Sequence, residues 1–437
     1  MDVDEAPGDA ARGFILYFPV VQVKGCEMDK TPLVVLDFDA ALAMVLGHAG
    51  TVGGGGVERL PLQACRGRVL AEAVRADRDQ PAFDRSTRDG FAVRAEDAGG
   101  SRTLRVLGQV RAGETWLGGV VERGCAVEIM TGAAVPAGAD AVVMVEHVVV
   151  EGDVLRVERS LRVGENVVPR GAETVAGKVV LPVGRVMGAA EISVAASCGL
   201  AEVSVFARPT VAIVATGDEL VELDEPMSEV QIRNSNSYAL AALVKAAGGV
   251  GERLAIARDT LGELRAQVAE GREADLLLLT GGVSMGKYDL VEQVLGEFRV
   301  EFFFTGALIQ PGKPVVFGRL PSEKGWTYFF GLPGNPVSAQ VCFHLFVSPM
   351  LRALAGRTEI APVFLEARLA EEAKGGARMT RFLPAELSGG WDGVKVSVVG
   401  GQGSGDVVAN ARGNGYVVLP AGVEDFPAGL TVRVLLR

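Results

Sequence analysis

Two apolar segments that each run into a glycine-rich turn constrain the fold of this chain more than any other feature. They read LLLLTGGVSMGKYDLV over residues 276–291 and FFGLPGNPVSAQVCF over residues 329–343. A continuous apolar run is typical of a buried parallel strand, and a helical pattern follows each turn. The carboxyl ends of parallel strands meet at one edge of a doubly wound sheet, where ligands bind. The sequence therefore predicts an α/β domain with a binding site at that edge.

The residues of these turns suit an anionic ligand. Gly334 lets a ligand approach bare backbone, Asn335 suits a helix N-cap, and Pro336 is pre-set for the first helical position. Free amides at a helix start attract anions, so we expect a polyanion to lie across both turns. The turn residues that we expect to bind it are Ser284, Pro333, Gly334, Asn335 and Pro336.

The composition limits the class of protein. The chain has 437 residues, of which 49% are hydrophobic and 22% charged, and we expect about two to four globular domains. The net charge of −11 argues against binding to nucleic acid or to an anionic membrane, both of which need a basic face. The five cysteines are scattered without metal-ligand spacing, which favours reduced thiols in a cytoplasmic protein. The apolar stretch 14–23 is too short to span a bilayer.

The pattern of apolar residues changes along the chain. Helical spacing covers residues 36–48, and short β runs broken by glycine and proline extend from 84 to about 180. Between 208 and 356 strands alternate with helical patterns, which indicates a doubly wound α/β domain. From 362 onward alternation returns and predicts a small β-barrel or sandwich. The clearest elements of the α/β domain are strands at 211–215 and 274–279 and helices at 237–247 and 337–354.

Acidic residues follow three strands of the predicted sheet. Glu219 comes after the first strand, Asp259 after the next and Asp289 after a third, so we expect them to converge at the same edge. Carboxylates suit Mg²⁺, which keeps several waters and bridges to substrate phosphates. The alternative is that each residue is a helix N-cap or a solvated turn residue.

Other turns carry polar residues that have two interpretations. Lys313, in QPGKPVVFG, is either a phosphate partner or a solvated lysine. The bend FDRSTRDGFAV places Asp89 beside Gly90, which also suits an ordinary β-turn. Thr131, in IMTGAAV, is open to the same alternative.

Six motifs occur along the chain in a fixed order. They are FDRSTRDGFAVR, IMTGAAVPAGADAVV, ATGDEL, TGGVSMGKYD, QPGKPVVFG and GLPGNPVSA. Their order and spacing resemble those of the molybdopterin molybdenumtransferase family, which includes MoeA and the gephyrin E domain. The resemblance covers nearly the whole chain after about Met28.

The resemblance implies an elongated homodimer of four-domain subunits. It also implies a crevice between the α/β domain of one subunit and the β-rich domain of the other, so that Asp89 acts across the dimer. The implied boundaries are 1–29 for an N-terminal extension expected to be disordered, 30–75 and 178–207 for a helical dimerisation segment, 76–177 for a β-rich insertion domain, 208–356 for the α/β molybdopterin-binding domain, and 357–437 for a C-terminal β-barrel.

The activity implied by the resemblance is insertion of molybdate into adenylylated molybdopterin, with Mg²⁺-dependent cleavage of the phosphoanhydride and release of AMP. Further candidate partners are a molybdopterin adenylyltransferase and molybdoenzymes. Of the acidic residues, Asp89, Glu219, Asp259 and Asp289 are expected to act in catalysis, and the last three of these to hold Mg²⁺. Matched motif by motif, the functional positions are Asp89, Thr131, Glu219, Asp259, Asp289, Pro333 and Pro336.

The chain departs from the family pattern where the family carries positive charge. Gly306 and Gln310 stand where lysines are usual, and Pro384 stands where an arginine is common. Arg85 and Arg88 are additional in the first of the six motifs. We expect these two arginines to bind molybdate in place of the lysines, since guanidinium groups suit oxyanions; the alternative is that both are solvated on a turn. The next candidates for binding the oxyanion are Arg170, Lys313 and Ser404.

Two classes of function remain open from the sequence. The first is an active molybdenum insertase, and the second is a binding protein that keeps the pterin pocket as a scaffold or carrier. The acidic residues favour the enzyme, because a scaffold has no need of Glu219, Asp259 and Asp289 together. A third option, adenylylation of molybdopterin, is less favoured because that activity belongs to a related stand-alone α/β domain.

Overall fold

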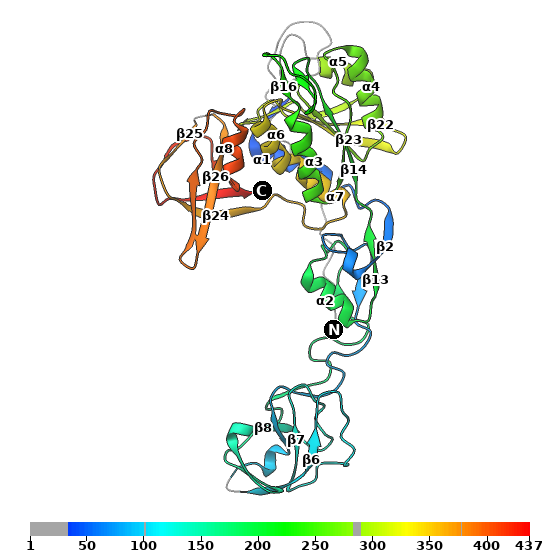
Figure 1. The fold of residues 1–437 in the computed structure, drawn as a ribbon, viewed down its shortest axis with the longest axis vertical. Helices are drawn as coiled ribbons and strands as arrows, with labels where there is room; N and C mark the ends of the chain where they lie inside the picture. Colours follow the sequence, from blue (N-terminus) through cyan, green and yellow to red (C-terminus); the bar gives the residue numbers. More distant parts are fainter. Residues whose placement is uncertain (1–33, 100–101, 283–289, 377) are drawn as a thin grey trace, which may run out of the picture. The chain divides into compact units, whose positions relative to one another are not determined.

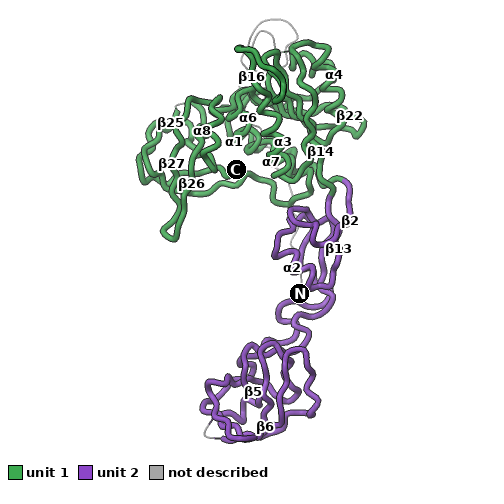
Figure 2. Tube along the Cα trace, viewed as in Figure 1, with its two compact units in different colours: residues 1–55, 207–437 green, residues 56–206 purple. Residues whose placement is uncertain are grey.

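The computed structural model describes residues 34–99, 102–282, 290–376 and 378–437. The chain divides into two compact units, which Figure 2 colours separately. The first unit combines the described residues up to Gly55 with Ala207–Arg437, and the second is Gly56–Phe206. The second unit is therefore an insertion in the sequence of the first. The predicted N-terminal extension and the predicted site residues Ser284 and Asp289 lie outside the described residues.

A six-stranded sheet forms the centre of the first unit (Figure 1). In spatial order its strands are β17 (Val250–Arg253), β14 (Thr210–Ala215), β18 (Leu276–Thr280), β23 (Gly325–Leu332), β22 (Val316–Ser322) and β19 (Glu301–Phe304). The first four strands are parallel, and β22 runs antiparallel to its two neighbours. All five residues of β18 are buried, as expected for a parallel strand that is covered on both faces.

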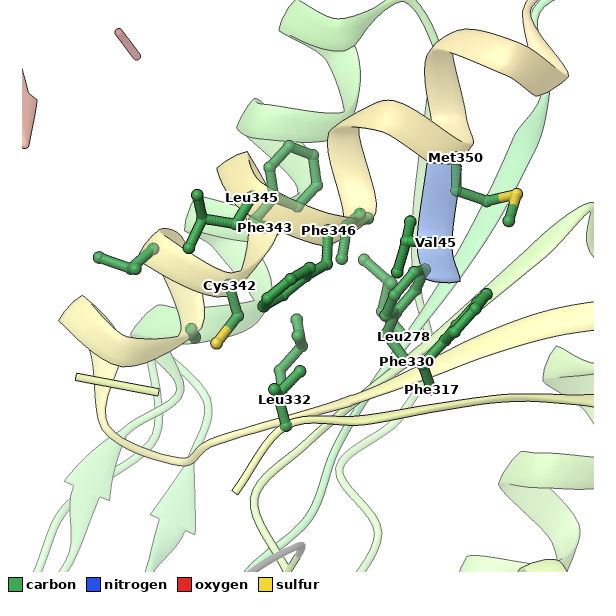
Figure 3. Close-up of a cluster of buried hydrophobic side chains, with 14 of the residues drawn as sticks. Val45, Leu278, Phe317, Phe330, Leu332, Cys342, Phe343, Leu345, Phe346 and Met350 are labelled. Atoms are coloured by element: carbon green, nitrogen blue, oxygen red, sulfur yellow. The ribbon is translucent and has the colours of Figure 1, made fainter. Parts of the chain in front are cut away.

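Helices cover both faces of this sheet, which confirms the doubly wound α/β arrangement. Their bounds are α1 (Phe38–Ala49), α3 (Ser235–Ala247), α4 (Leu261–Gly271), α5 (Leu290–Glu297), α6 (Pro336–Cys342), the π-helix η4 (Phe343–Val347) and α7 (Ser348–Leu354). One face of the sheet packs against α4 and α5. The other packs against α1, α3 and the continuous helix formed by α6, η4 and α7. Figure 3 shows part of that second core, with Phe346 and Met350 of the long helix near Phe330 of the sheet.

The long helix of residues 336–354 is a core helix. Among the described residues it is the one helix with the length and apolar composition of a membrane span, yet 78% of that span is buried inside the protein. Its phenylalanines Phe343 and Phe346 are at most 1% exposed. The apolar composition of this helix is therefore explained by packing against the sheet.

Helix α1 belongs to the first unit, although the sequence interpretation grouped residues 30–75 with 178–207. The Asp37 side chain accepts a hydrogen bond from the Ala40 amide at 2.8 Å and begins the helix. Ala41, Val45 and Ala49 recur every four residues and are at most 1% exposed, so they form one buried face. That face packs against the core that contains α7. The two-residue strand before α1 also pairs with Gly306–Ala307 of the same unit.

A closed barrel of five strands ends the first unit, as the sequence predicted. Strand β26 pairs with both β27 and β28, which closes the ring through β24 and β30. The short strand β21 (Ile309–Gln310) also pairs with β26 and so joins the barrel to the α/β part. The barrel strands are β24 (Phe364–Leu369), β26 (Thr380–Gly390), β27 (Gly393–Val398), β28 (Gly415–Leu419) and β30 (Thr431–Leu436).

The second unit is mostly β structure. A six-stranded sheet lies within the predicted β-rich insertion, in the spatial order β8 (Ala141–Met144), β5 (Gly90–Val93), β7 (Cys125–Ile129), β6 (Thr103–Val110), β10 (Val154–Val157) and β9 (Val148–Glu151). The flanking segments, which we expected to be helical, contain the helix α2 (Ala189–Ser197) and the paired strands β2 (Val57–Pro61) and β13 (Glu202–Phe206). Every second residue of β13 from Val203 is buried, a two-residue period that favours a strand over a helix. The role of these segments in dimerisation stays a prediction.

Candidate functional site

The carboxyl edge of the central sheet forms a cleft. Thr280 at the end of β18 is in register with Ala215 of β14 and with Leu332 of β23, so the three strands end at the same level. The turns that follow these strands enclose a cleft of about 520 Å³. The residues of the cleft used below are Thr216, Glu219, Asn236, Gly281, Gly334 and Asn335. The predicted position of the binding site therefore agrees with a concave surface in the structure.

The turn after β18 requires glycine. Gly281 has a φ of +92°, and a Cβ there would lie 2.3 Å from the carbonyl oxygen of Thr216. Gly282 has a φ of +59° and would place a Cβ 3.0 Å from Val291 Cγ2. Side chains are thus excluded at these two positions by backbone conformation and by the neighbouring strand end. The result is a floor of exposed backbone on this side of the cleft.

The turn after β23 has glycine for a different reason. A Cβ on Gly334 would meet only the Cα of Gly281, at 3.6 Å, which is ordinary van der Waals contact. Packing within the protein therefore does not demand glycine at this exposed position. Close approach of a ligand to the backbone at Gly334 fits this open space and stays a prediction.

The long helix begins at the cleft. Asn335 occupies the N-cap position and Pro336 the first turn, but the Asn335 side chain does not cap the helix. Its Nδ2 instead donates a hydrogen bond to Ser404 Oγ at 3.0 Å, and the Val337 amide donates to the Ser404 carbonyl at 3.0 Å. Ser404, one of the predicted oxyanion residues, thus ties the barrel to the helix start. The positive end of the helix dipole faces the cleft that Asn335 and Pro336 line.

Asn236 is a cleft residue that the sequence interpretation missed. Its Nδ2 donates to the carbonyl oxygen of Gly334 at 2.7 Å and to Thr280 Oγ1 at 3.1 Å. One amide group therefore holds the turn after β23 against the end of β18. The run NSNS at the start of α3 contained a usable indication: Asn234 alone caps the helix, by accepting from the Ser237 amide at 3.3 Å, which leaves Asn236 in the first turn free for another role.

Two of the predicted acidic residues lie at or beside the cleft. Glu219 lines it, and Gly217 makes room for this carboxylate, because a Cβ there would lie 2.4 Å from Glu219 Oε2. Asp259 Oδ1 accepts a hydrogen bond from Thr216 Oγ1 at 3.0 Å, and the Asp259 amide donates to Asp218 Oδ1 at 3.2 Å. Asp259 is therefore tied to a cleft residue, although it is not itself among the residues that line the cleft.

These acidic residues fit Mg²⁺ that is bound partly by a substrate. No three His, Cys, Asp or Glu side chains gather as a ligand set in the part of the chain that the structure describes. Mg²⁺ needs only one or two carboxylates when phosphates and waters complete its octahedron. The donors at this edge, Glu219 and Asp259, are oxygen ligands of that number and kind. Their role as metal ligands stays a prediction.

Lys313 and Ser404 line a second hollow beside the cleft. We call it the adjoining cavity: it has a volume of about 410 Å³ and lies between the segment 309–314, the helix start and the barrel. It shares Pro314, Pro333 and Asn335 with the cleft. Lys313 therefore lies next to the cleft and not among the cleft residues.

The second unit brings together Asp89 and Thr131. The Thr131 amide donates to Asp89 Oδ1 at 2.6 Å, and this backbone hydrogen bond, with a smaller one from the Thr131 side chain, holds the pKa of Asp89 below its ordinary value. Asp89 is thus held ionised by a neighbour 42 positions away in the chain. We call this region the bend; it comprises Asp84–Gly90, Thr131 and the segment 170–173.

Ion pairs or backbone hydrogen bonds engage most of the charged side chains at the bend. Arg170 Nε donates to Asp79 Oδ2 at 2.8 Å, and the Arg170 amide donates to Asp84 Oδ1 at 2.8 Å. Arg85 pairs with Glu173 at 2.9 Å. Arg88 is exposed, and its guanidinium has no hydrogen-bond or ion-pair partner among the residues that the structure describes. The two arginines that we expected to act alike are therefore in different electrostatic states.

Family models match the chain in the order of its domains. The MoeA N-terminal region (domain I and II) matches residues 36–199, a probable molybdopterin binding domain matches 212–353, and the MoeA C-terminal region (domain IV) matches 366–436. A molybdopterin molybdenumtransferase of Staphylococcus aureus (strain MSSA476) is 35% identical over 384 residues, which cover 86% of this chain and 90% of that protein. The chain belongs to the MoeA family.

Other MoeA relatives agree with this assignment. A molybdopterin molybdenumtransferase of Nostoc sp. (strain PCC 7120) is 35% identical over 388 residues, covering 86% of this chain and 88% of the relative. The crystal structure of a molybdopterin biosynthesis MoeA protein from Pyrococcus horikoshii OT3 superposes with a TM-score of 0.76 at 28% identity, covering 92% of this chain and 100% of that one. The family resemblance read from the six motifs is thus confirmed.

Proposed function

We propose that this protein is a molybdopterin molybdenumtransferase, which inserts molybdate into adenylylated molybdopterin and releases AMP. The observation that carries the proposal is the cleft at the carboxyl ends of β14, β18 and β23, where two glycine turns and a helix start meet. Such a surface suits a diphosphate, because backbone amides and the helix dipole attract negative charge without displacing side chains. Membership in the MoeA family supports the same substrate.

The residues of the chain would have distinct roles in this reaction. Exposed backbone at Gly281 and Gly334 would receive the diphosphate, and Asn236 would hold the two turns at a fixed separation. Thr216 would orient the Asp259 carboxylate through their 3.0 Å hydrogen bond. Mg²⁺ held by Glu219 and Asp259 would neutralise charge on the diphosphate as AMP leaves.

The direct test is AMP release from adenylylated molybdopterin by the purified protein, with and without molybdate. We expect release that depends on molybdate and on Mg²⁺, and we expect Asp259→Asn to reduce it by about 100-fold, since losing a charge-stabilising group costs roughly that much. Asp392→Asn, in an exposed barrel turn, serves as the matched control and should retain full activity. Tight binding of molybdopterin without any turnover would instead favour the scaffold.

The homodimer, the Mg²⁺ requirement and the cytoplasmic location stay predictions of this proposal. If Asp89 acts across a dimer, mixing inactive Asp89→Ala and Asp259→Ala proteins should restore part of the activity through heterodimers with one intact site. Subunit exchange can be followed with two differently labelled proteins. Exchange without any recovery of activity would show that one chain contributes both residues.

A further inference from the structure

The adjoining cavity has a lining that suits an uncharged group. Most of its side chains are apolar and come from both the α/β part and the barrel. A volume of about 410 Å³ with apolar walls and a few polar groups is typical of a small-molecule site. The apolar residues of the lining that matter most here are Ile309, Val337, Met379, Leu383, Val398 and Val399.

Most of the charged side chains of the cavity are already engaged. Asp406 Oδ1 accepts from the Ala409 amide at 2.9 Å and Oδ2 from the Gln402 amide at 3.0 Å, so this carboxylate is fixed and stays ionised. Arg381 Nη1 donates to the carbonyl of Lys374 at 2.6 Å and to that of Gly375 at 3.2 Å. Within the described lining this leaves Lys313 as the ammonium without a partner. Arg381 keeps its positive charge, but its Nη1 is held by two carbonyls and the fixed carboxylate of Asp406 offsets one of the two cations, so the lining is a weak site for a free dianion.

Two of the positions at which we expected a cation from the family resemblance lie at this cavity. Gln310 and Pro384 both line it, where a lysine and an arginine were expected. Gly306 is buried outside the lining, and a Cβ there would lie 3.2 Å from Val35 Cγ2 and 3.3 Å from the Lys313 carbonyl oxygen, so a lysine at this position would displace its neighbours. At Gln310 and Pro384 the cavity therefore presents an amide and an apolar ring in place of the expected cations.

We infer that the adjoining cavity binds a fused nitrogen heterocycle of the substrate, either its pterin or its adenine, while the diphosphate lies in the cleft. This inference rests on the proposed function. The shared wall of Pro314, Pro333 and Asn335 puts the two hollows side by side, as a single substrate with a ring next to a diphosphate would require. Apolar side chains contact the ring faces, and the Gln310 amide is placed to hydrogen-bond the ring edge.

Two valines of one barrel strand provide a matched test. Val398 lines the cavity and Val394 does not, yet both lie on β27 and are 36% and 37% exposed. A tryptophan at either position is partly in solvent, so both variants should fold. Val398→Trp fills the cavity, and Val394→Trp controls for the added bulk. Circular dichroism and the thermal midpoint of unfolding would verify that both remain folded.

Binding is measured with AMP and with neopterin, which carry the two heterocycles separately. We expect Val398→Trp to raise the Kd of one of these ligands at least tenfold and to raise the KM for adenylylated molybdopterin by a similar factor. The half-saturating molybdate concentration should change less than twofold, and Val394→Trp should match the wild type. The ligand whose Kd rises in Val398→Trp identifies the ring, adenine or pterin, that the cavity binds.

Several results would overturn the inference. Wild-type protein that binds neither AMP nor neopterin, equal binding in the wild type and Val398→Trp, or equal effects of the two tryptophans would each do so. The inference would also be overturned if Val398→Trp changed only the half-saturating molybdate concentration. As a second variant, Gln310→Lys restores a cation; a tenfold fall in the half-saturating molybdate concentration would place the oxyanion in the cavity. The binding titrations need no turnover, so failure of the proposed function is recognised separately, as absent molybdate-dependent AMP release.

Discussion

The cleft of the first unit and the bend of the second differ in the interactions that hold their polar groups in place. At the cleft, glycine backbone, a helix start and the Asn236 amide provide neutral hydrogen-bond donors. Main-chain geometry fixes the positions of these donors. At the bend, Arg85, Asp89 and Arg170 take part in charged hydrogen bonds or ion pairs, and these interactions fix the positions of their side chains. The comparison teaches that backbone changes should damage the anion-binding turns of the cleft most, whereas changes of charge should damage the bend most.

The largest effect is expected from Gly281→Ala. A Cβ 2.3 Å from the Thr216 carbonyl at a φ of +92° forces the turn to move, at a cost of about 1–3 kcal/mol. A shift of this turn should reduce turnover by about 100-fold. Gly262→Ala in α4 is the control, because nothing lies within 4 Å of its Cβ position, and it should be neutral or slightly stabilising. Normal turnover in Gly281→Ala would show that the backbone geometry of this turn is not needed for the reaction.

The next effect is expected from Asp89→Asn, which keeps the shape of the side chain and removes its charge. We expect turnover to fall by roughly 10–100-fold, as for the loss of an acid–base or charge-stabilising group, with little change in the thermal midpoint because the side chain is exposed. Asp425→Asn breaks an exposed ion pair with Lys374 in the barrel region and is the matched control. If both variants keep full activity, the charge of the bend has no part in the reaction.

Arg85 and Arg88 allow a paired and an unpaired arginine to be compared within the bend. Arg88→Ala should raise the half-saturating molybdate concentration by about tenfold, which corresponds to about 1.4 kcal/mol. Arg85→Ala should change it less, because the Arg85 guanidinium is already paired with Glu173 at 2.9 Å. The measurement is AMP release against molybdate concentration at constant ionic strength. Equal curves for the wild type and both variants would show that the oxyanion is bound elsewhere.

The smallest effect concerns the titration of Asp89. Because the Thr131 amide lowers the pKa of this carboxyl, its midpoint in an NMR titration should lie below the ordinary value of 3.8. The related stabilisation is present above the unfolded pKa and is lost as the pH falls through the lower folded pKa. Thr131→Val keeps the amide and removes the hydroxyl, so it should raise the midpoint only in part. A midpoint at or above 3.8 in the wild type would contradict the hydrogen bond.

The sequence predicted those parts of the fold that depend on local patterns. The helices expected at 237–247 and 337–354 are observed as Ser235–Ala247 and as the continuous helix from Pro336 to Leu354. The glycine turns after β18 and β23 were located from their residues, because positive φ and close backbone approach leave a direct mark on residue choice. Because parallel strands end at the same edge of a sheet, the sequence also predicted that these turns lie close together.

Features that depend on long-range packing were not predictable. The contact of Asn236 with Gly334 spans 98 positions, and from the sequence an asparagine near a helix start is equally well explained as a cap. The pairing of Arg85 with Glu173 distinguishes it from Arg88, although both looked alike in the motif. The assignment of α1 to the first unit depends on its partner α7, about 300 residues later in the chain.

That distance has a consequence for biosynthesis. Helix α1 buries Ala41, Val45 and Ala49 in a core that also needs α7, and the strand Val35–Leu36 pairs with Gly306–Ala307. The second unit, Gly56–Phe206, is complete long before those partners leave the ribosome. At about 5–20 residues per second, α1 waits roughly 15–60 s with its apolar face uncovered. During synthesis, helix α1 is therefore exposed to aggregation and open to chaperones while the inserted unit behind it can already have folded.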